Sequence, residues 1–437
     1  MNKIKATILN PFYFKIIATL IFVVSTTQYT GFIYDYGIYA IVIWGSGVFW
    51  INTFLNKTRL KKIDYLIYIF ILGYFITIVT NLDDSVPVQL FVLLCCCMYF
   101  YSFFSADDIQ KYERDNYVIM FIIVIITFIF VLISYGLFIY DMTTGVNNTY
   151  NIHGDTNIQF IGIYKGVSTQ AVLSGISMLS SLGLIVVAIK QPIRYKRIFI
   201  IFNIVNFVLQ DLAVTISYTT AGMIAVTISL MIGLFLIFID KNKKKNVVIT
   251  LSFLLIAIIL SVSNYMVMNY VGSNFIDTFA SVSKTSSELQ ADDAISGVSN
   301  SNGRMVIWES GIEQWKENLV FGNGYGDFYV KVNLNETKYI EYRNVHSGYL
   351  ELLNSCGLWG FVSIIVFGAF YIGRFFIIIL RDKNRYKYIG VAMIIIHSCL
   401  YAAINQLFIL DRDISVFLLC TFLGLARINC KQEDNLL

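Results

Sequence analysis

Long apolar segments alternate with short polar ones along most of the chain. A helix needs roughly 20 mostly apolar residues to cross a bilayer, and about twelve segments meet this condition. They lie near 11–30, 37–55, 64–80, 87–105, 116–140, 167–189, 198–215, 220–239, 246–265, 357–380, 388–409 and 413–429. The pattern predicts an all-α polytopic membrane protein whose residues 1–437 form a single membrane domain.

Charge is sparse and unevenly distributed. The chain is 57% hydrophobic and 14% charged, whereas soluble domains are about a quarter charged. Most of the 32 basic residues stand in every second loop. Their clusters are Lys3 and Lys5; Lys57, Arg59, Lys61 and Lys62; Lys111 and Arg114; Lys190, Arg194, Lys196 and Arg197; Lys241, Lys243, Lys244 and Lys245; Arg381, Lys383, Arg385 and Lys387; and Arg427 and Lys431. Because cytoplasmic loops are enriched in lysine and arginine, we expect both termini to be cytoplasmic. No A-x-A-like cleavage motif follows the first apolar run, which is therefore expected to remain as helix one.

The cysteines give no sign of a disulfide framework or a metal site. Three of the seven, Cys95 to Cys97, are consecutive inside an apolar run, and only Cys356 is expected near the outer face. No Cys/His spacing typical of a metal site occurs. We expect no metal and no cofactor.

Two outer loops stand out by length, a modest one near 141–166 and a large one at 266–350, between helices nine and ten. Within the large extracytoplasmic loop, 281–303 is polar, and no strand pattern is evident. Loops of this length are commonly functional or disordered.

The second half of the large loop carries an ordered pattern. Apolar residues at helical spacing predict an amphipathic helix at the membrane interface over 304–319. Its apolar face would hold Met305, Trp308, Ile312 and Trp315, with Ser301 or Asn302 as the N-cap. The glycine-rich segment 321–329 follows. The first interpretation of this segment is a tight turn. The alternative is a phosphate cradle, in which the backbone of the loop binds phosphate.

The order of motifs in this segment is distinctive. Gly303, Arg304 and Trp308 are followed by GNGYG at 322–326 and by HSGYLELLNSCGLWG at 346–360, directly before a membrane helix. This order and the topology around it resemble the O-antigen polymerase and ligase superfamily of bacterial membrane glycosyltransferases. The resemblance implies a GT-C-like membrane enzyme in the bacterial cytoplasmic (inner) membrane. It would transfer glycan from an undecaprenyl-diphosphate-linked donor to a glycan acceptor, without metal or nucleotide sugar.

The candidate residues suit that reaction. A hydroxyl attacks well only when a base takes its proton, and imidazole titrates near neutral pH. His346, the only histidine of the large loop, would be that base, although a lone loop histidine is commonly a hydrogen-bonded surface residue. Arg304 would stabilise the leaving diphosphate, because guanidinium pairs with phosphate oxygens in a planar, bidentate manner. The alternative for Arg304 is contact with lipid headgroups, and Arg343 would be a second cation.

One element of the family pattern is missing. Relatives carry an S-x-S-R-like arginine near the outer end of an earlier helix, where Tyr218, Thr219 and Thr220 stand here. Lys165 is the nearest outer cation from another loop and is a candidate substitute. Trp308 and Tyr349 are the outer aromatics expected to bind substrate by contacts with sugar rings.

Two polar stripes interrupt the apolar helices. The stripes are Asn203, Asn206 and Gln210 near 198–215, and His397, Tyr401 and Asn405 near 388–409. Polar groups at membrane depth face protein or a cavity. Interhelical hydrogen bonding is the first interpretation, and lining of a lipid or glycan cavity is the second.

The expected function is that of a polymerase, which adds lipid-linked repeat units to a surface polysaccharide such as O-antigen or capsule. A ligase that moves finished polymer to lipid A core or protein shares the same donor and remains an alternative. A flippase or transporter for lipid-linked oligosaccharide is the alternative of another class. It is disfavoured because the predicted helices are nearly free of central charges. Membrane lipids and a chain-length regulator protein are the expected partners, and nucleic acid is not expected.

Overall fold

The computed structural model describes residues 10–54, 60–82, 85–105, 108–144, 149–153, 157–217, 219–238, 266, 301–325, 330–335, 338–342, 345–405, 410 and 413–433. The described helices are α2 (Pro11–Ser25), α3 (Ile38–Phe54), α4 (Tyr65–Thr80), α5 (Val86–Phe104), α6 (Ile109–Thr144), α7 (Val167–Lys190), α8 (Lys196–Ile216), α9 (Thr220–Phe238), α12 (Ser301–Trp315), α13 (Gly348–Arg381), α14 (Ile389–Ile404) and α15 (Ile414–Glu433). The strands are β1 (Tyr150–His153), β2 (Asn157–Phe160), β3 (Val330–Asn335) and β4 (Lys338–Tyr342).

The helices confirm the all-α polytopic class predicted from hydropathy. Among the described residues, nine helices are long and apolar enough to cross a membrane. Two shorter apolar helices, Pro11–Ser25 and Ile414–Ile428, match the first and last predicted spans. The predicted span at 246–265 lies outside the described residues. The expected total of about twelve spans therefore stays a prediction.

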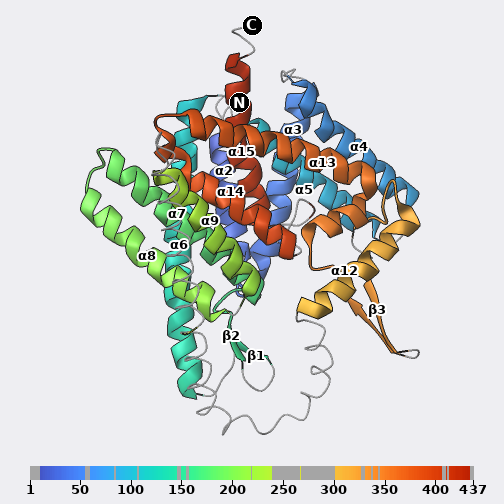
Figure 1. Cartoon of the computed structure of the whole chain (residues 1–437), viewed down its shortest axis with the longest axis horizontal. Coiled ribbons are helices and arrows are strands. Elements are labelled where there is room, and N and C mark those ends of the chain that lie inside the picture. Colours follow the sequence, from blue (N-terminus) through green and yellow to red (C-terminus); the bar gives the residue numbers. More distant parts are fainter. Residues whose placement is uncertain are drawn as a thin grey trace, which may run out of the picture.

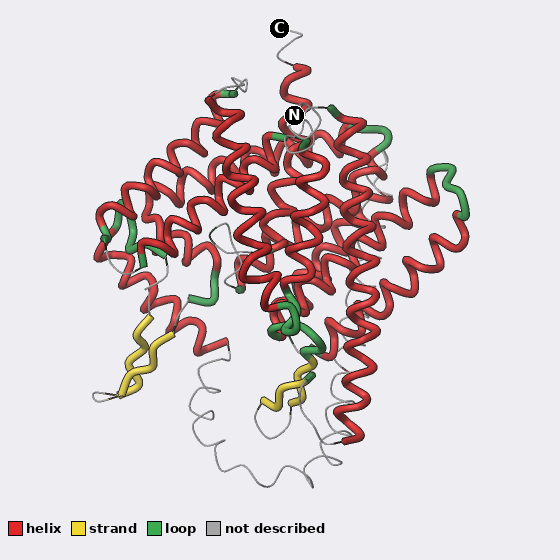
Figure 2. Tube along the Cα trace, turned by 180° about the vertical axis from the view of Figure 1, so that it is seen from behind, coloured by secondary structure: helices red, strands yellow, loops and turns green. Residues whose placement is uncertain are grey.

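The helices pack into one bundle with different structures at its two ends. In Figure 1, α15 leaves the bundle at the top, while α12 and both hairpins lie at the bottom. The same arrangement is seen from behind in Figure 2. The described parts of the two segments assigned to the outer face from the sequence therefore lie at the same end of the bundle.

The strands were not expected. β1 pairs with β2, and β3 with β4, each as an antiparallel two-stranded hairpin. The expectation of a strand-free large loop was wrong. The missed signal is the alternation of Val330, Val332 and Leu334 with polar residues, which is the period of a strand with one apolar face.

Polar side chains inside the bundle join helices α6, α7 and α8. Asn206 Nδ2 donates to Ser177 Oγ at 2.9 Å and to Ser181 Oγ at 2.8 Å. Gln210 Nε2 donates to the Thr127 carbonyl oxygen at 3.0 Å. These contacts confirm interhelical hydrogen bonding for Asn206 and Gln210, as expected for polar groups at membrane depth. Asn203, the third member of the stripe, donates to the Phe199 carbonyl oxygen of its own helix at 2.8 Å.

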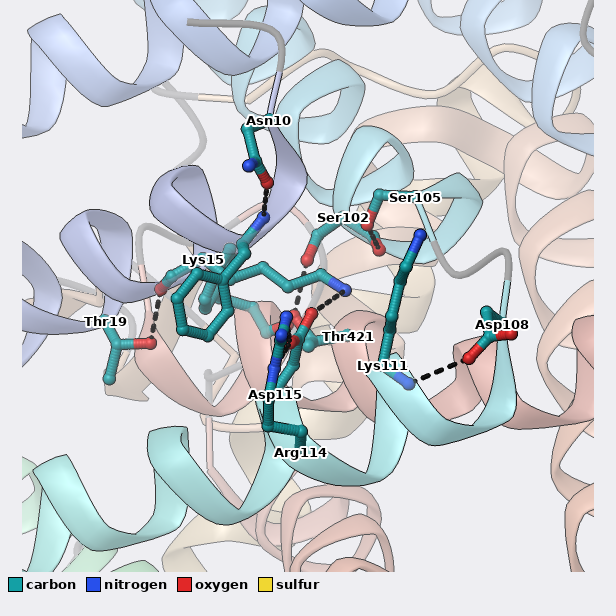
Figure 3. A network of polar contacts seen from close by, with 12 residues as sticks. Asn10, Lys15, Thr19, Ser102, Ser105, Asp108, Lys111, Arg114, Asp115 and Thr421 are labelled. Carbon is teal, nitrogen blue, oxygen red and sulfur yellow. Dashed lines mark hydrogen bonds and ion pairs between the residues drawn. The ribbon is translucent and has the colours of Figure 1, made fainter. Parts of the chain in front are cut away.

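Buried charges join the helices at the end opposite the hairpins. Lys15 of α2 reaches Asp115 of α6 with 4.0 Å between Nζ and Oδ2, and Figure 3 shows the two side chains converging. Arg427 of α15 pairs with Asp64, just before α4, with 3.7 Å between Nε and Oδ2. Counted from the sequence as a member of a basic loop cluster, Arg427 is in fact completely buried.

Candidate functional site

The candidate site is built around a kink in α13. This helix was expected at 357–380 but begins at Gly348 and bends at Gly357, whose φ is +62° and ψ −170°. A residue other than glycine is strained at a positive φ. The segment from Gly348 to Cys356 is thus a separate half-helix that starts two residues after His346, with Ser347 as its N-cap.

The glycine-rich turn forms backbone hydrogen bonds with α13 at this kink. The N–H groups of Asn323 and Gly324 donate to the carbonyl oxygens of Asn354 and Ser355 at 2.7 and 3.1 Å. In return, the N–H of Leu358 donates to the Leu319 carbonyl oxygen at 2.9 Å. The kink frees backbone groups of α13, and the turn satisfies them. This favours the tight-turn interpretation over a phosphate cradle, because the amides of the turn already donate to protein carbonyls.

Gly322→Ala should destabilise the protein markedly. Gly322 has φ of +76°, and a Cβ added there would lie 2.4 Å from the backbone nitrogen of Gly357. The left-handed conformation alone costs a non-glycine residue roughly 1–2 kcal/mol, and the backbone overlap adds to it. We expect a lower melting temperature for the protein in detergent. Gly373→Ala is the matched control, since nothing lies within 4 Å of its added Cβ. An unchanged melting temperature for Gly322→Ala would contradict this account of the turn.

His346 lies at a strained backbone position just before α13, and neighbouring residues stabilise it. We call residues 345–348 the histidine corner. The φ of His346 is +48°, and His346 and Tyr195 are the non-glycine residues with positive φ in the described part of the chain. Such a conformation costs about 1–3 kcal/mol and persists where the surroundings fix it. The N–H of Val345 donates to Glu351 Oε2 at 3.4 Å, and the N–H of Gly348 donates to the Asn405 carbonyl oxygen at 2.8 Å. The half-buried imidazole is thereby placed at the N-terminal, partially positive end of a helix dipole.

Helix α12 packs against this corner, though not through the face predicted. Gly311 approaches Val345 so closely that a Cβ on Gly311 would lie 2.5 Å from Val345 Cγ1. Ile307, one turn earlier, is also buried. Met305 and Ile312, assigned to the apolar face, are exposed instead. The face of α12 that packs against Val345 is therefore not the predicted one. The close approach of α12 to Val345 requires a glycine at position 311 and leaves no room for an aromatic side chain there.

The structure places the backbone of Arg304 in the first turns of α12, which also contains Trp308. The indole Nε1 of Trp308 is buried and has no hydrogen-bond partner among the described residues. Arg343 and the position of the Arg304 side chain lie outside what the structure describes. The roles of all three residues therefore stay predictions.

Lys165 lies in a second loop at the same end of the bundle. Its ammonium stands 3.1 Å from the centroid of the Tyr34 ring, a cation–π contact. Its backbone N–H donates to the Thr26 carbonyl oxygen at 2.9 Å. The side chain is exposed. Its proposed contact with a diphosphate stays a prediction.

An apolar cavity has Tyr349, three residues after His346, in its wall. It has a volume of about 380 Å³ and lies between α5, α13, α14 and α15. Tyr349 lines it, together with Gly368, Phe376 and Leu423. The hydroxyl of Tyr349 donates to the Cys399 carbonyl oxygen at 3.1 Å. Tyr349 thus connects the histidine corner to an apolar chamber, a setting that was not foreseen for it.

Two supports of the corner were missed from the sequence. Glu351, for which no role was predicted, is buried, and its carboxylate accepts a hydrogen bond from the backbone N–H of Val345. Asn405 was counted only in a polar stripe, yet its backbone oxygen holds Gly348. For Glu351, the available signal in the sequence was a carboxylate five positions after His346. The support from Asn405 comes from its backbone carbonyl oxygen, and the residue type gives no indication of where that oxygen points.

The chain is a polytopic membrane protein with a histidine corner at one end of its bundle and an apolar cavity whose wall includes Tyr349. A family model described as O-antigen ligase matches residues 205–365. This confirms the resemblance to the O-antigen polymerase and ligase superfamily and indicates a glycosyltransferase-like enzyme acting on lipid-linked glycans. The matched segment contains every candidate residue except Lys165. A search of curated proteins gave no match.

Proposed function

We propose that this protein is a membrane glycosyltransferase that polymerises lipid-diphosphate-linked repeat units into a surface polysaccharide. The reaction takes place at the outer face of the bacterial cytoplasmic membrane, at the end of the bundle that carries α12 and the hairpins. The observation that carries the proposal is that Tyr349, three residues after His346, lines the apolar cavity. A lipid-linked glycan has an apolar tail and a polar head, and Tyr349 joins an apolar chamber to the segment that carries the imidazole.

In the proposed reaction, His346 removes the proton from a hydroxyl of the acceptor glycan as that oxygen attacks the anomeric carbon of the donor. The bond between the anomeric carbon and the phosphate oxygen breaks, and undecaprenyl diphosphate leaves. Arg304 and Arg343 stabilise the negative charge on the leaving diphosphate, where fixed cations are effective. Lys165 and the dipole of α13 add positive charge at the same end of the bundle. The products are the extended glycan and the free carrier lipid.

The cavity is the proposed site of the donor's isoprenoid chain. Each buried CH₂ contributes about 0.8 kcal/mol, so loss of contact with two of them weakens binding about tenfold. Gly368→Phe, which fills the cavity from α13, should therefore raise the donor KM about tenfold with little change in kcat. Initial rates over a donor titration in detergent measure both.

Gly373→Phe is the matched control for this experiment. Gly373 lies in the same helix, no atom lies within 4 Å of an added Cβ at either glycine, and Gly373 does not line the cavity. Equal donor KM values for the two variants would exclude the cavity as the lipid site.

A deletion strain tests the function in cells. We expect loss of the protein to leave surface glycan with a single repeat unit, and complementation to restore a ladder on a gel. The ligase alternative shares its name with the matching family model, although the match does not separate ligase from polymerase. It predicts instead that a ladder forms on the carrier lipid and fails to reach its final acceptor. Repeat units trapped at the cytoplasmic face would point to a flippase and contradict both.

A further inference from the structure

The His346 corner depends on the end of helix α14. The carbonyl oxygen of Asn405 accepts the hydrogen bond from the N–H of Gly348 at 2.8 Å. Asn405 is the C-terminal cap of α14 and has an extended backbone, with φ −134° and ψ 165°. The direction in which its carbonyl points therefore decides where the backbone after His346 is held.

The Tyr401 hydroxyl fixes that cap. It accepts a hydrogen bond from Asn405 Nδ2 at 2.8 Å and donates one to the Ser168 carbonyl oxygen at 3.1 Å. The Tyr401 side chain is fully buried, and its ring stacks on His397 with 5.9 Å between centroids. A hydroxyl that donates once and accepts once in this way has little freedom to rotate.

Ser168 belongs to the first turn of α7, three residues after Lys165. The Tyr401 hydroxyl is therefore the junction of three segments: the loop of Lys165, the end of α14, and the corner of His346. The polar stripe of α14 was interpreted as ordinary interhelical hydrogen bonding. Tyr401 of α14 does bond Ser168 of α7 in this way, and Tyr401 and Asn405 also join the two loops that carry candidate site residues.

We propose that Tyr401, acting through Asn405, is a positioning residue that holds His346 in register with the loop of Lys165. The proposal rests on the proposed transferase function. Tyr401 does not touch substrate; its hydroxyl sets the position of the Asn405 carbonyl, and this sets the backbone at Gly348. Since a misplacement of about 1 Å can cost about a hundredfold in rate, loss of the hydroxyl should slow the reaction without weakening donor binding.

Tyr401→Phe tests this most sharply, because it removes the hydroxyl and keeps the stacked ring. In the purified full-length protein, we expect kcat to fall at least about tenfold while the donor KM stays within about twofold. In a His346→Ala background, the same substitution should have no further effect on the residual rate, because two residues acting through one step are not additive. Asn405→Ala, which keeps the backbone carbonyl and removes Nδ2, should lower kcat in the same direction.

Tyr112→Phe is the matched control. Tyr112 is also buried, and its hydroxyl donates to the Phe422 carbonyl oxygen between α6 and α15. Its loss should leave kcat unchanged, so that an effect specific to Tyr401 is not a general consequence of removing a buried hydroxyl.

The outcomes separate this proposal from the function on which it rests. If wild-type protein fails to extend a repeat unit, the proposed function itself fails; if His346→Ala polymerises normally, His346 is not the base and the positioning role falls with it. If His346→Ala is inactive while Tyr401→Phe and Asn405→Ala keep the full kcat, the positioning role is overturned. It is also overturned if Tyr401→Phe lowers the rate equally with and without His346, or if only its melting temperature falls.

Discussion

His346→Ala is expected to abolish glycan elongation while leaving the protein folded in the membrane. General-base catalysis contributes about 10²–10⁴-fold to a rate, so the polymer formed per unit time should fall by at least about a hundredfold. The donor KM should change much less, because the imidazole acts on the acceptor hydroxyl. Quantifying the ladder at equal protein level measures the effect.

His346→Asn separates the base from the backbone. His346 has a φ of +48°, and asparagine is among the residues that tolerate this region. The Asn variant should keep the corner and still be inactive, because an amide does not take up the proton. A full ladder from either variant at normal expression would show that His346 is not the base.

The second large effect concerns stability at the other end of the bundle. Arg427 and Asp64 are both completely buried, and Asp64 Oδ1 also accepts a hydrogen bond from the Tyr371 hydroxyl at 2.5 Å. Removing one partner of a buried pair leaves an uncompensated charge, at a cost of about 3–5 kcal/mol. Arg427→Met should therefore lower the melting temperature in detergent by many degrees, or prevent accumulation of the protein.

A double variant tests whether the unpaired charge of Asp64 causes this loss of stability. Asp64→Asn combined with Arg427→Met removes both charges and keeps an acceptor for Tyr371, so we expect it to recover most of the lost stability. Lys387→Met is the control. Its pair with Glu113 is partly exposed, with 24% and 14% of the two side chains accessible, and such pairs are worth little. Equal losses for Lys387→Met and Arg427→Met would contradict the account.

Hydropathy predicted the bundle well, because spanning a bilayer imposes one strong length rule. Two members of the polar stripe of α8 were also interpreted correctly, since Asn206 and Gln210 have few alternatives to interhelical bonds at membrane depth. The start of α13 was placed too late. Gly357 looked like the boundary of a helix, but the bend there is stabilised by a turn that precedes α13 in the chain.

The supports of the candidate site could not be predicted from the sequence. The left-handed backbone of His346 has no signature in a non-glycine residue. The bond from Gly348 to Asn405 joins backbone atoms of residues far apart in the chain. Likewise, nothing in the sequence pairs Asp64 with Arg427. Motif order identified the residues expected to carry the chemistry, whereas long-range packing determines how they are held.

The most direct test of the central claim is polymerisation by the purified protein in proteoliposomes that contain one synthetic undecaprenyl-diphosphate-linked repeat unit, with EDTA present. We predict a ladder of glycan lengths on the carrier lipid for the wild type, release of free undecaprenyl diphosphate, and neither product for His346→Ala. Wild-type protein that leaves the repeat unit unextended, in the presence of donor and acceptor units alike, would contradict a polymerase.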